Sequence, residues 1–439
     1  MKSKKKLLYI DNYMVPGYKV EHEELGINSV QLNTGIERIE DGIVVSDRSI
    51  EQKYIDYLRH IGLLKNVEII SIFGKSNDII SRILENDDNL KKIDSAKNHE
   101  LDTFGISEVM GINNANKFVK SYKRLCHNLN LDNLYNSEIA SKMMQKSIMR
   151  NLIENELENN SDLKKLLKLP NGFFGICIKN LKLDDILQFI KECKQKKVRR
   201  IIIKKDISAF NKGNYIFDFN QIEDAYKNKR LINFFKERCS LKDNEIFNIE
   251  EYVPHESSVS CGLSIKKNKD VCINSVQGQV FVNRKLLGFA SINNQELKKK
   301  LIEINSIIGG ILAKHNYYGD LTPNFVIDSD GLIYFIEINM RKGGSSIPYN
   351  VVKKKYGNNS HLIKYISSML FFKKDIDFDE IIDKITMSYD SIYQNFLVEL
   401  ARFELTKMCT IVTVSEAKNN DPVDHLIQIK KKIAPYMRV

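Results

Sequence analysis

The sequence predicts a mixed α/β and α+β fold with three domains, at residues 1–135, 136–252 and 253–439. Three patterns lead to this prediction. Short apolar runs alternate with amphipathic helices near the N-terminus, a helix-rich stretch then leads into a second set of strands, and antiparallel strands flank a long helix later in the chain. The first pattern implies a largely parallel sheet.

The first domain shows strand and helix signals but no chemical motif. Leu7–Ile10 and Val67–Phe73 are short apolar runs of strand type. Residues 50–63 and 78–90 carry apolar side chains at helical spacing. We therefore expect an α/β unit here.

The second domain contains the strand that leads into a polar loop. Leu183–Lys197 has the spacing of an amphipathic helix, and Val198–Lys204 reads as a buried strand followed by the loop at 205–214. Further strands are expected at 214–219 and 247–254.

The third domain begins with predicted antiparallel strands at 259–265, 271–282 and 285–290. Residues 295–315 form a long predicted helix with one apolar side, and a β-hairpin follows it. The tail mixes helices with one strand at 409–414.

Length and composition are those of a globular protein. The 439 residues are 43% hydrophobic and 28% charged, which suffices for a large core. No stretch has the apolar length that a membrane span needs, and the basic N-terminus becomes polar too soon for a secretory signal. We expect a cytoplasmic protein that binds no membrane.

The charge balance favours anionic ligands. The net charge is +11, from 67 Lys+Arg against 56 Asp+Glu, but the lysines form scattered clusters without interleaved aromatic residues. We therefore expect no nucleic-acid partner. The seven cysteines include no CxxC pair, which argues against a disulfide framework or a zinc site. A homodimer is compatible with the sequence.

The most informative segment is the predicted hairpin at 319–344. Turn residues at 328–331 separate two β-prone runs. Because side chains alternate along a strand, Glu337, Asn339 and Arg341 should share one face. The opposite face should carry Tyr334, Ile336 and Ile338.

Such a face has the chemistry of a metal–phosphate site. Carboxylate and amide oxygens from Glu337 and Asn339 suit Mg²⁺, and the Arg341 guanidinium can hold a phosphate or carboxylate. Gly343 and Gly344 allow a ligand to approach the backbone closely. The alternative is that Glu337 is an ion-pair partner inside the core.

The order of these features resembles the ATP-grasp ligase superfamily. A strand lysine, a polar loop, Glu-Glu-Tyr-Val-Pro at 250–254, a long helix and Glu-x-Asn-x-Arg at 337–341 follow one another between about residues 140 and 350. The resemblance implies an N-terminal pre-ATP-grasp domain and a two-lobed ATP-grasp fold. Within the superfamily, the chain looks most like natural-product peptide and amino acid ligases of the pheganomycin type.

The resemblance implies the following nucleotide contacts. Lys204, Gly213 and Asn214 would hold ATP phosphates, although Ser208 and Asn211 replace the usual loop glycines and Phe210 replaces a usual serine. Lys142 matches the earlier phosphate lysine, with Lys146 as its rival. The adenine hinge would comprise Glu250, Glu251, Tyr252 and Val253. We do not assign a catalytic role to His255 or His315.

The metal and substrate residues follow from the same resemblance. A turn centred on 329–330 would pair Thr322 with Glu337 and Asp320 with Asn339, leaving Asn324 one diagonal step away. Asn324 is the favoured third metal ligand, with Asp320 or a degenerate site as alternatives. The acyl group and its acceptor would meet at Arg341, Gly343 and Gly344, with Arg284 as a further substrate contact or a solvated residue.

The implied activity is ATP-dependent ligation of a small-molecule carboxylate to an amine. With ATP and Mg²⁺ bound, Lys142, Lys204 and Arg341 would stabilise the transferring phosphoryl group, and an acyl phosphate would precede the amide. Two alternatives stay open. One is the loading of an amino acid onto the thiol of an acidic carrier protein, and the other is a nucleotide-binding protein without catalysis.

Overall fold

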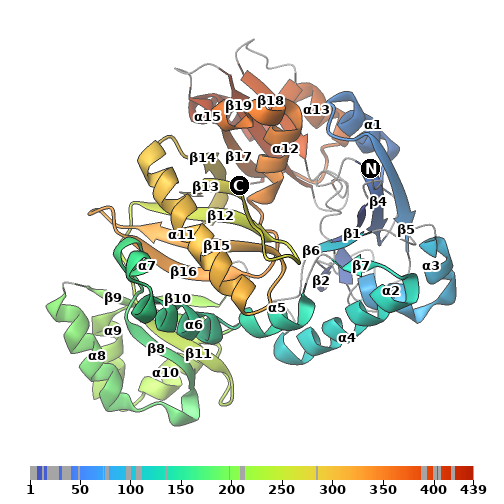
Figure 1. The fold of residues 1–439 in the computed structure, drawn as a ribbon. Coiled ribbons are helices and arrows are strands. Elements are labelled where there is room, and N and C mark those ends of the chain that lie inside the picture. The colour runs from blue at the N-terminus through green and yellow to red at the C-terminus, as the bar shows by residue number, and fades with distance from the viewer. Residues whose placement is uncertain are drawn as a thin grey trace.

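A computed structural model of the chain contains three main sheets, which Figure 1 shows at the right, at the lower left and through the centre. The residues that it describes are 7–11, 14–16, 29–31, 41–47, 50–72, 74, 79–94, 100–104, 111–133, 136–196, 198–207, 213–282, 285–386, 393–398, 403, 407–416 and 421–438. No helix in these ranges has the length and apolar character of a membrane span.

The first sheet is parallel, as predicted. Its strand order is β5-β4-β1-β6-β7, and every neighbouring pair is parallel. Its strands are β1 (Leu7–Asp11), β4 (Asp41–Ser46), β5 (Asn66–Ser71), β6 (Glu100–Phe104) and β7 (Asp132–Asn133). Its helices are α1 (Gln52–His60), α2 (Ile79–Glu85), α3 (Asp87–Lys92) and α4 (Gly111–Leu129). A separate antiparallel ribbon joins β2 (Met14–Pro16) to β3 (Ser29–Gln31).

The second sheet is antiparallel, with the order β10-β9-β11-β8. It comprises β8 (Gly172–Cys177), β9 (Arg200–Lys205), β10 (Asn214–Asp218) and β11 (Ile246–Glu251). Its helices are α8 (Leu183–Gln195), α9 (Phe219–Lys227) and α10 (Leu231–Cys239), which bury Ile203 and Ile249 in a shared core. Alternation along the strands therefore turns Lys204, Asn248 and Glu250 to the opposite face.

The third sheet has eight strands in the order β16-β15-β12-β13-β14-β17-β19-β18. These are β12 (Ser257–Ile265), β13 (Val271–Val282), β14 (Lys285–Ser291), β15 (Gly319–Ile327), β16 (Ile333–Asn339), β17 (Lys364–Phe371), β18 (Tyr393–Val398) and β19 (Met408–Ser415). The predicted long helix is α11 (Gln295–Lys314), which packs on β12 and β13 through Leu301, Ile304 and Ile308. The remaining helices are α12 (Ser346–Tyr356), α13 (Phe378–Thr386) and α15 (Pro422–Ile433).

Residues 136–168 precede the second sheet in the chain, and in space they bridge the second and third sheets. They form α5 (Ser137–Met143), α6 (Lys146–Asn159) and α7 (Ser161–Leu166), and α6 contacts β8 and β11 on one side and β16 on the other. At the end of this segment, Lys168 N donates to Ile333 O at 2.8 Å and Phe335 N donates to Lys168 O at 3.0 Å. The segment therefore covers the outer edge of β16, which would otherwise expose unpaired backbone groups.

The hairpin of β15 and β16 forms where predicted, but its register differs from the prediction. Gly331 has φ +77° at the end of a tight turn that starts at Asp328. A β-bulge then leaves Ile336 without a partner on β15, so that Asn324 lies directly opposite Glu337, and Thr322 opposite Asn339. The pairs next to the turn, such as Ile327 with Ile333, are already one residue out of the predicted register, and the bulge adds a second residue. The predicted pairings of Thr322 with Glu337 and of Asp320 with Asn339 are therefore wrong.

The bulge also changes which side chains share a face. Ile333, Phe335 and Ile338 are buried in the core, whereas Tyr334 and Ile336 are only partly buried. The prediction that Ile338 shares a face with Tyr334 and Ile336 is therefore wrong. The bulged residue interrupts the two-residue alternation and turns Glu337 away from the core.

Two adjacent glycines of α11 test its packing on β13. A Cβ on Gly309 would lie 2.5 Å from Val271 Cγ1, whereas a Cβ on Gly310 would meet nothing within 4 Å. Gly309→Ala should therefore lower the free energy of unfolding by about 1–3 kcal/mol through overpacking. Gly310→Ala should raise it by about 0.5–1 kcal/mol through helix propensity. Urea unfolding measures both changes, and equal effects would contradict this packing.

Candidate active site

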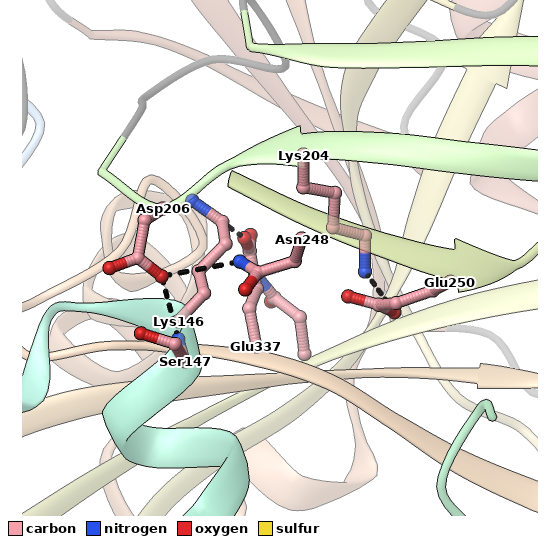
Figure 2. A network of polar contacts seen from close by, with 8 residues as sticks. Lys146, Ser147, Lys204, Asp206, Asn248, Glu250 and Glu337 are labelled. Atoms are coloured by element: carbon pink, nitrogen blue, oxygen red, sulfur yellow. Dashed lines mark hydrogen bonds and ion pairs between the residues drawn. The ribbon is translucent and has the colours of Figure 1, made fainter. Parts of the chain in front are cut away.

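Polar side chains from α6, β9, β11 and β16 gather between the second and third sheets (Figure 2). A strand face, the β16 bulge and a helix terminus each direct polar side chains into this space. The face of β9 and β11 opposite α8, α9 and α10 carries Lys204, Asn248 and Glu250, and the bulge of β16 turns Glu337 toward the same space. The N-terminus of α6 adds Lys146.

Glu337 and Asn324 are neighbours on the third sheet. Asn324 Nδ2 donates to Glu337 Oε1 at 3.1 Å. Gln279 Nε2, on β13, lies 3.5 Å from Asn324 Oδ1. Gln279 was missed at the sequence level because its contact depends on the register of three strands, for which the sequence offers no signal.

Lys146 approaches Glu337 from the other side. Its Nζ is 3.9 Å from Glu337 Oε2, and the side chains of Lys146 and Glu337 are 11% and 25% exposed. A pair at this distance and exposure stays accessible to a ligand, unlike a closed ion pair inside the core. Lys142 is exposed on α5, so the rival Lys146 is the lysine that the fold brings to Glu337.

The segment after β16 folds back over Thr322. Thr322 Oγ1 donates to Arg341 O at 2.9 Å, and Arg341 Nη1 donates to Lys342 O at 3.3 Å. A Cβ on Gly343 would lie 2.8 Å from Thr322 Cγ2, so this close approach requires glycine. A Cβ on Gly344 would meet Phe289 only at 3.5 Å, which is ordinary contact.

Asp320, the alternative metal ligand, already has partners. Lys342 Nζ lies 3.4 Å from its Oδ2, and Ser264 Oγ donates to its Oδ1. Lys342 Nζ also lies 5.7 Å from the centre of the Tyr9 ring, on β1 of the first sheet. Among these residues, Asn324 is therefore the one in direct contact with Glu337.

Lys204 and Glu250 form a buried ion pair. Lys204 Nζ donates to Glu250 Oε2 at 2.8 Å, and the two side chains are only 3% and 6% exposed. Each charge compensates the burial of the other, because an unpaired ion in this environment would lose its hydration. The pair fixes Glu250 on the face that looks toward α6 (Figure 2).

The predicted hinge lies where β11 leaves the second sheet. Glu251 Oε1 accepts from Asn171 N at 3.0 Å and from Asn171 Nδ2 at 2.8 Å. The Arg200 guanidinium stacks 4.6 Å from the centre of the Tyr252 ring, and Val253 is partly buried. The hinge residues thus lie beside the first residues of β8.

Arg150, one turn into α6, is a further cation near the hinge. It stacks 4.4 Å from the centre of the Phe174 ring and donates to Pro170 O at 2.6 Å. Burial lowers the pKa of its guanidinium, and the carboxylates of Glu250, Glu154 and Glu251 oppose that shift.

The phosphate loop is described at its two ends. Lys205 N donates to Gly213 O at 2.9 Å, and Asn214 pairs with Lys204 across β9 and β10. The predicted residues Ser208, Phe210, Asn211 and Arg284 lie outside the described residues.

The donor set suits a cation that is shared with phosphates. Within the described ranges, no cluster of three His, Cys, Asp or Glu side chains could hold a metal. Glu337 supplies a carboxylate, the Asn324 amide lies against it, and Asn339 follows two residues later on the same strand. Mg²⁺ commonly takes one or two protein carboxylates and completes its shell with water and substrate phosphates. These residues fit that pattern.

No protein-family model and no curated protein matches the sequence. Solved structures do match the fold. An ADP complex of N5-carboxyaminoimidazole ribonucleotide synthetase aligns over 98% of this chain and 96% of that one, with TM-score 0.57 and 12% identity. The chain has the ATP-grasp fold.

Two other ligases align over similar lengths. Biotin carboxylase from Campylobacter jejuni covers 99% of this chain and 92% of its own, with TM-score 0.54 and 14% identity. An L-amino acid ligase from Bacillus licheniformis covers 99% and 98%, with TM-score 0.52 and 12% identity. Identities this low establish the fold alone.

The buried Lys204–Glu250 pair can be tested by stability. Lys204→Met should lower the free energy of unfolding by about 3–5 kcal/mol, because it leaves a buried carboxylate unpaired. Adding Glu250→Gln should restore most of that loss. The exposed pair of Lys194 and Glu223 provides the control, since Lys194→Met should change stability by about 1 kcal/mol or less. Equal losses in urea unfolding would contradict the buried pair.

Proposed function

We propose that the chain is an ATP-dependent carboxylate–amine ligase that forms an acyl phosphate and releases ADP and phosphate. One observation carries the proposal: Glu337 and Asn324 of the third sheet and Lys146 of helix α6 converge on one point. An anionic carboxylate, a neutral amide and an ammonium in contact can hold a metal–phosphate group, and a purely structural pair would need no amide.

The nucleotide would lie between the second and third sheets. Similar structures are described as complexes with ADP or a βγ-ATP ligand, which supports a nucleotide in this position. The adenine would lie at the hinge of Glu250, Glu251, Tyr252 and Val253, and the phosphates would extend toward Glu337. Lys204, Gly213 and Asn214 would follow the phosphates from the second sheet.

Mg²⁺ would be held by Glu337, Asn324 and Asn339, and when bound it offsets charge on the phosphates. The chain's own cations complete this compensation. Lys146 takes the role first assigned to Lys142, because its Nζ reaches Glu337. Arg341 would neutralise the carboxylate or the transferring phosphoryl group at the end of β16.

The reaction then needs no protein nucleophile. The substrate carboxylate attacks the γ-phosphorus of ATP, and ADP leaves. The amine next attacks the acyl carbon, phosphate leaves, and the amine loses a proton.

An assay of ADP release tests the activity. Purified protein with ATP, Mg²⁺ and pooled amino acids should release ADP and form amide products. Lys146→Met should lower turnover about a hundredfold because it removes a charge aimed at the phosphates. The control Lys142→Met, also on the connecting segment, should stay near wild type.

Other outcomes separate the alternatives. ADP that forms only when an acidic carrier protein is present would indicate thioester loading. ATP binding without turnover under all conditions would indicate a nucleotide-binding protein without catalysis.

The metal site can be tested without turnover. Asn324→Asp should strengthen Mg²⁺ binding about tenfold in the presence of ADP, because it adds a second carboxylate to the donor set. Without Mg²⁺ the same variant should melt at a lower temperature, since two carboxylates then repel each other. Melting curves with and without Mg²⁺ measure both effects.

The control for this measurement is Asp320→Asn, which removes a carboxylate already paired with Lys342. It should leave the Mg²⁺ response unchanged. If Asp320→Asn abolished that response and Asn324→Asp left it unaltered, Asp320 and not Asn324 would be the ligand.

A further inference from the structure

We propose that Asp206 is a positioning residue that holds Lys146 against Glu337. The proposal rests on the function proposed above. Asp206 directly follows β9 and is only 2% exposed. The mechanism described above does not use its buried carboxylate.

The contacts of Asp206 converge on the first two residues of α6. Its Oδ1 accepts from Ser147 N at 2.7 Å, and its main-chain oxygen accepts from Lys146 N at 3.1 Å. Figure 2 shows the Asp206 carboxylate beside the start of this helix. Asp206 thus holds the backbone of Lys146, while the Lys146 side chain reaches Glu337.

Helix α6 lacks a local cap. Gln145 occupies its N-cap position and makes no side-chain capping hydrogen bond. Asp206 supplies the missing acceptor from a strand 59 residues further along the chain. A carboxylate at this end of a helix also interacts favourably with the helix dipole. The start of α6 therefore depends on the second sheet.

Asp206 is itself fixed by the second sheet. Its N–H donates to Ile246 O at 3.1 Å, and Asn248 Nδ2 donates to its Oδ1 at 3.2 Å. Asn248 Oδ1 in turn accepts from Gly175 N at 2.8 Å. Three strands thus determine where the carboxylate lies.

One feature favours a role beyond capping. Asp206 Oδ2 is buried and has no hydrogen-bond partner among the described residues. A neutral serine or asparagine could cap the helix without burying a carboxylate in this way.

A double-mutant cycle tests the coupling. The affinity for a non-hydrolysable ATP analogue with Mg²⁺ is measured by calorimetry in wild type, Asp206→Ala, Lys146→Met and the double variant. Asp206→Ala should weaken binding about tenfold when Lys146 is present and less than about twofold when it is absent. A merely structural role would weaken binding equally in both backgrounds.

Two further variants control for folding. Asp421 caps α15 by accepting from Val423 N at 2.9 Å, so Asp421→Ala also removes an aspartate cap, but away from the site. It should lower the melting temperature and leave affinity unchanged. Asp206→Asn keeps an acceptor for Ser147 and should stay within about threefold of wild type.

The outcomes distinguish the two proposals. Additive losses in the cycle, or an Asp206→Asn variant as impaired as Asp206→Ala, would overturn the positioning role alone. A wild-type protein that does not bind the nucleotide would overturn the proposed function, and the positioning role with it.

Discussion

One β-bulge determines where the Glu337 carboxylate lies. Without the extra residue, strict alternation would place Glu337 on the same face as Ile333 and Phe335, which are core residues. A carboxylate there would be buried without compensation. The bulge turns Glu337 outward and sets it opposite Asn324. The segment with Arg341 continues from the end of the same strand. The bulge thus determines both the local path of β16 and which polar group lies beside the Glu337 carboxylate.

Helix α6 is the second constraint, because it contacts both sheets of the site. It presents Lys146 to Glu337 on the third sheet and depends on Asp206 of the second sheet for its first turn. The buried pair of Lys204 and Glu250 holds the neighbouring face of the second sheet. A cation of α6 therefore faces a carboxylate of the third sheet, and a closed ion pair lies on the second sheet.

The sequence was sufficient to predict the parts of the fold that depend on local patterns. Turn chemistry and β-prone runs predicted the hairpin, and helical spacing predicted α11. The register of the hairpin was not predictable, because a bulge depends on packing against neighbouring elements, here β15 and α6, rather than on local propensity alone.

The site residues that escaped prediction share one property. Gln279 and Asp206 contact their partners through strands that are distant in the sequence, and Lys146 could not be separated from Lys142 until α6 was placed on both sheets. No periodicity reports such contacts. By contrast, Glu337 and Asn339 lie two residues apart on one strand, so a local pattern is enough to find them.

The arrangement of α6 has a consequence for biosynthesis. Lys146 and the strand with Asp206 are translated well before Glu337, and ribosomes add about 5–20 residues per second. For a period on the order of ten seconds, the nascent chain therefore carries Lys146 and Asp206 without Glu337. Under the proposed function, the unfinished chain would lack the carboxylate that holds Mg²⁺ until the late hairpin has left the ribosome.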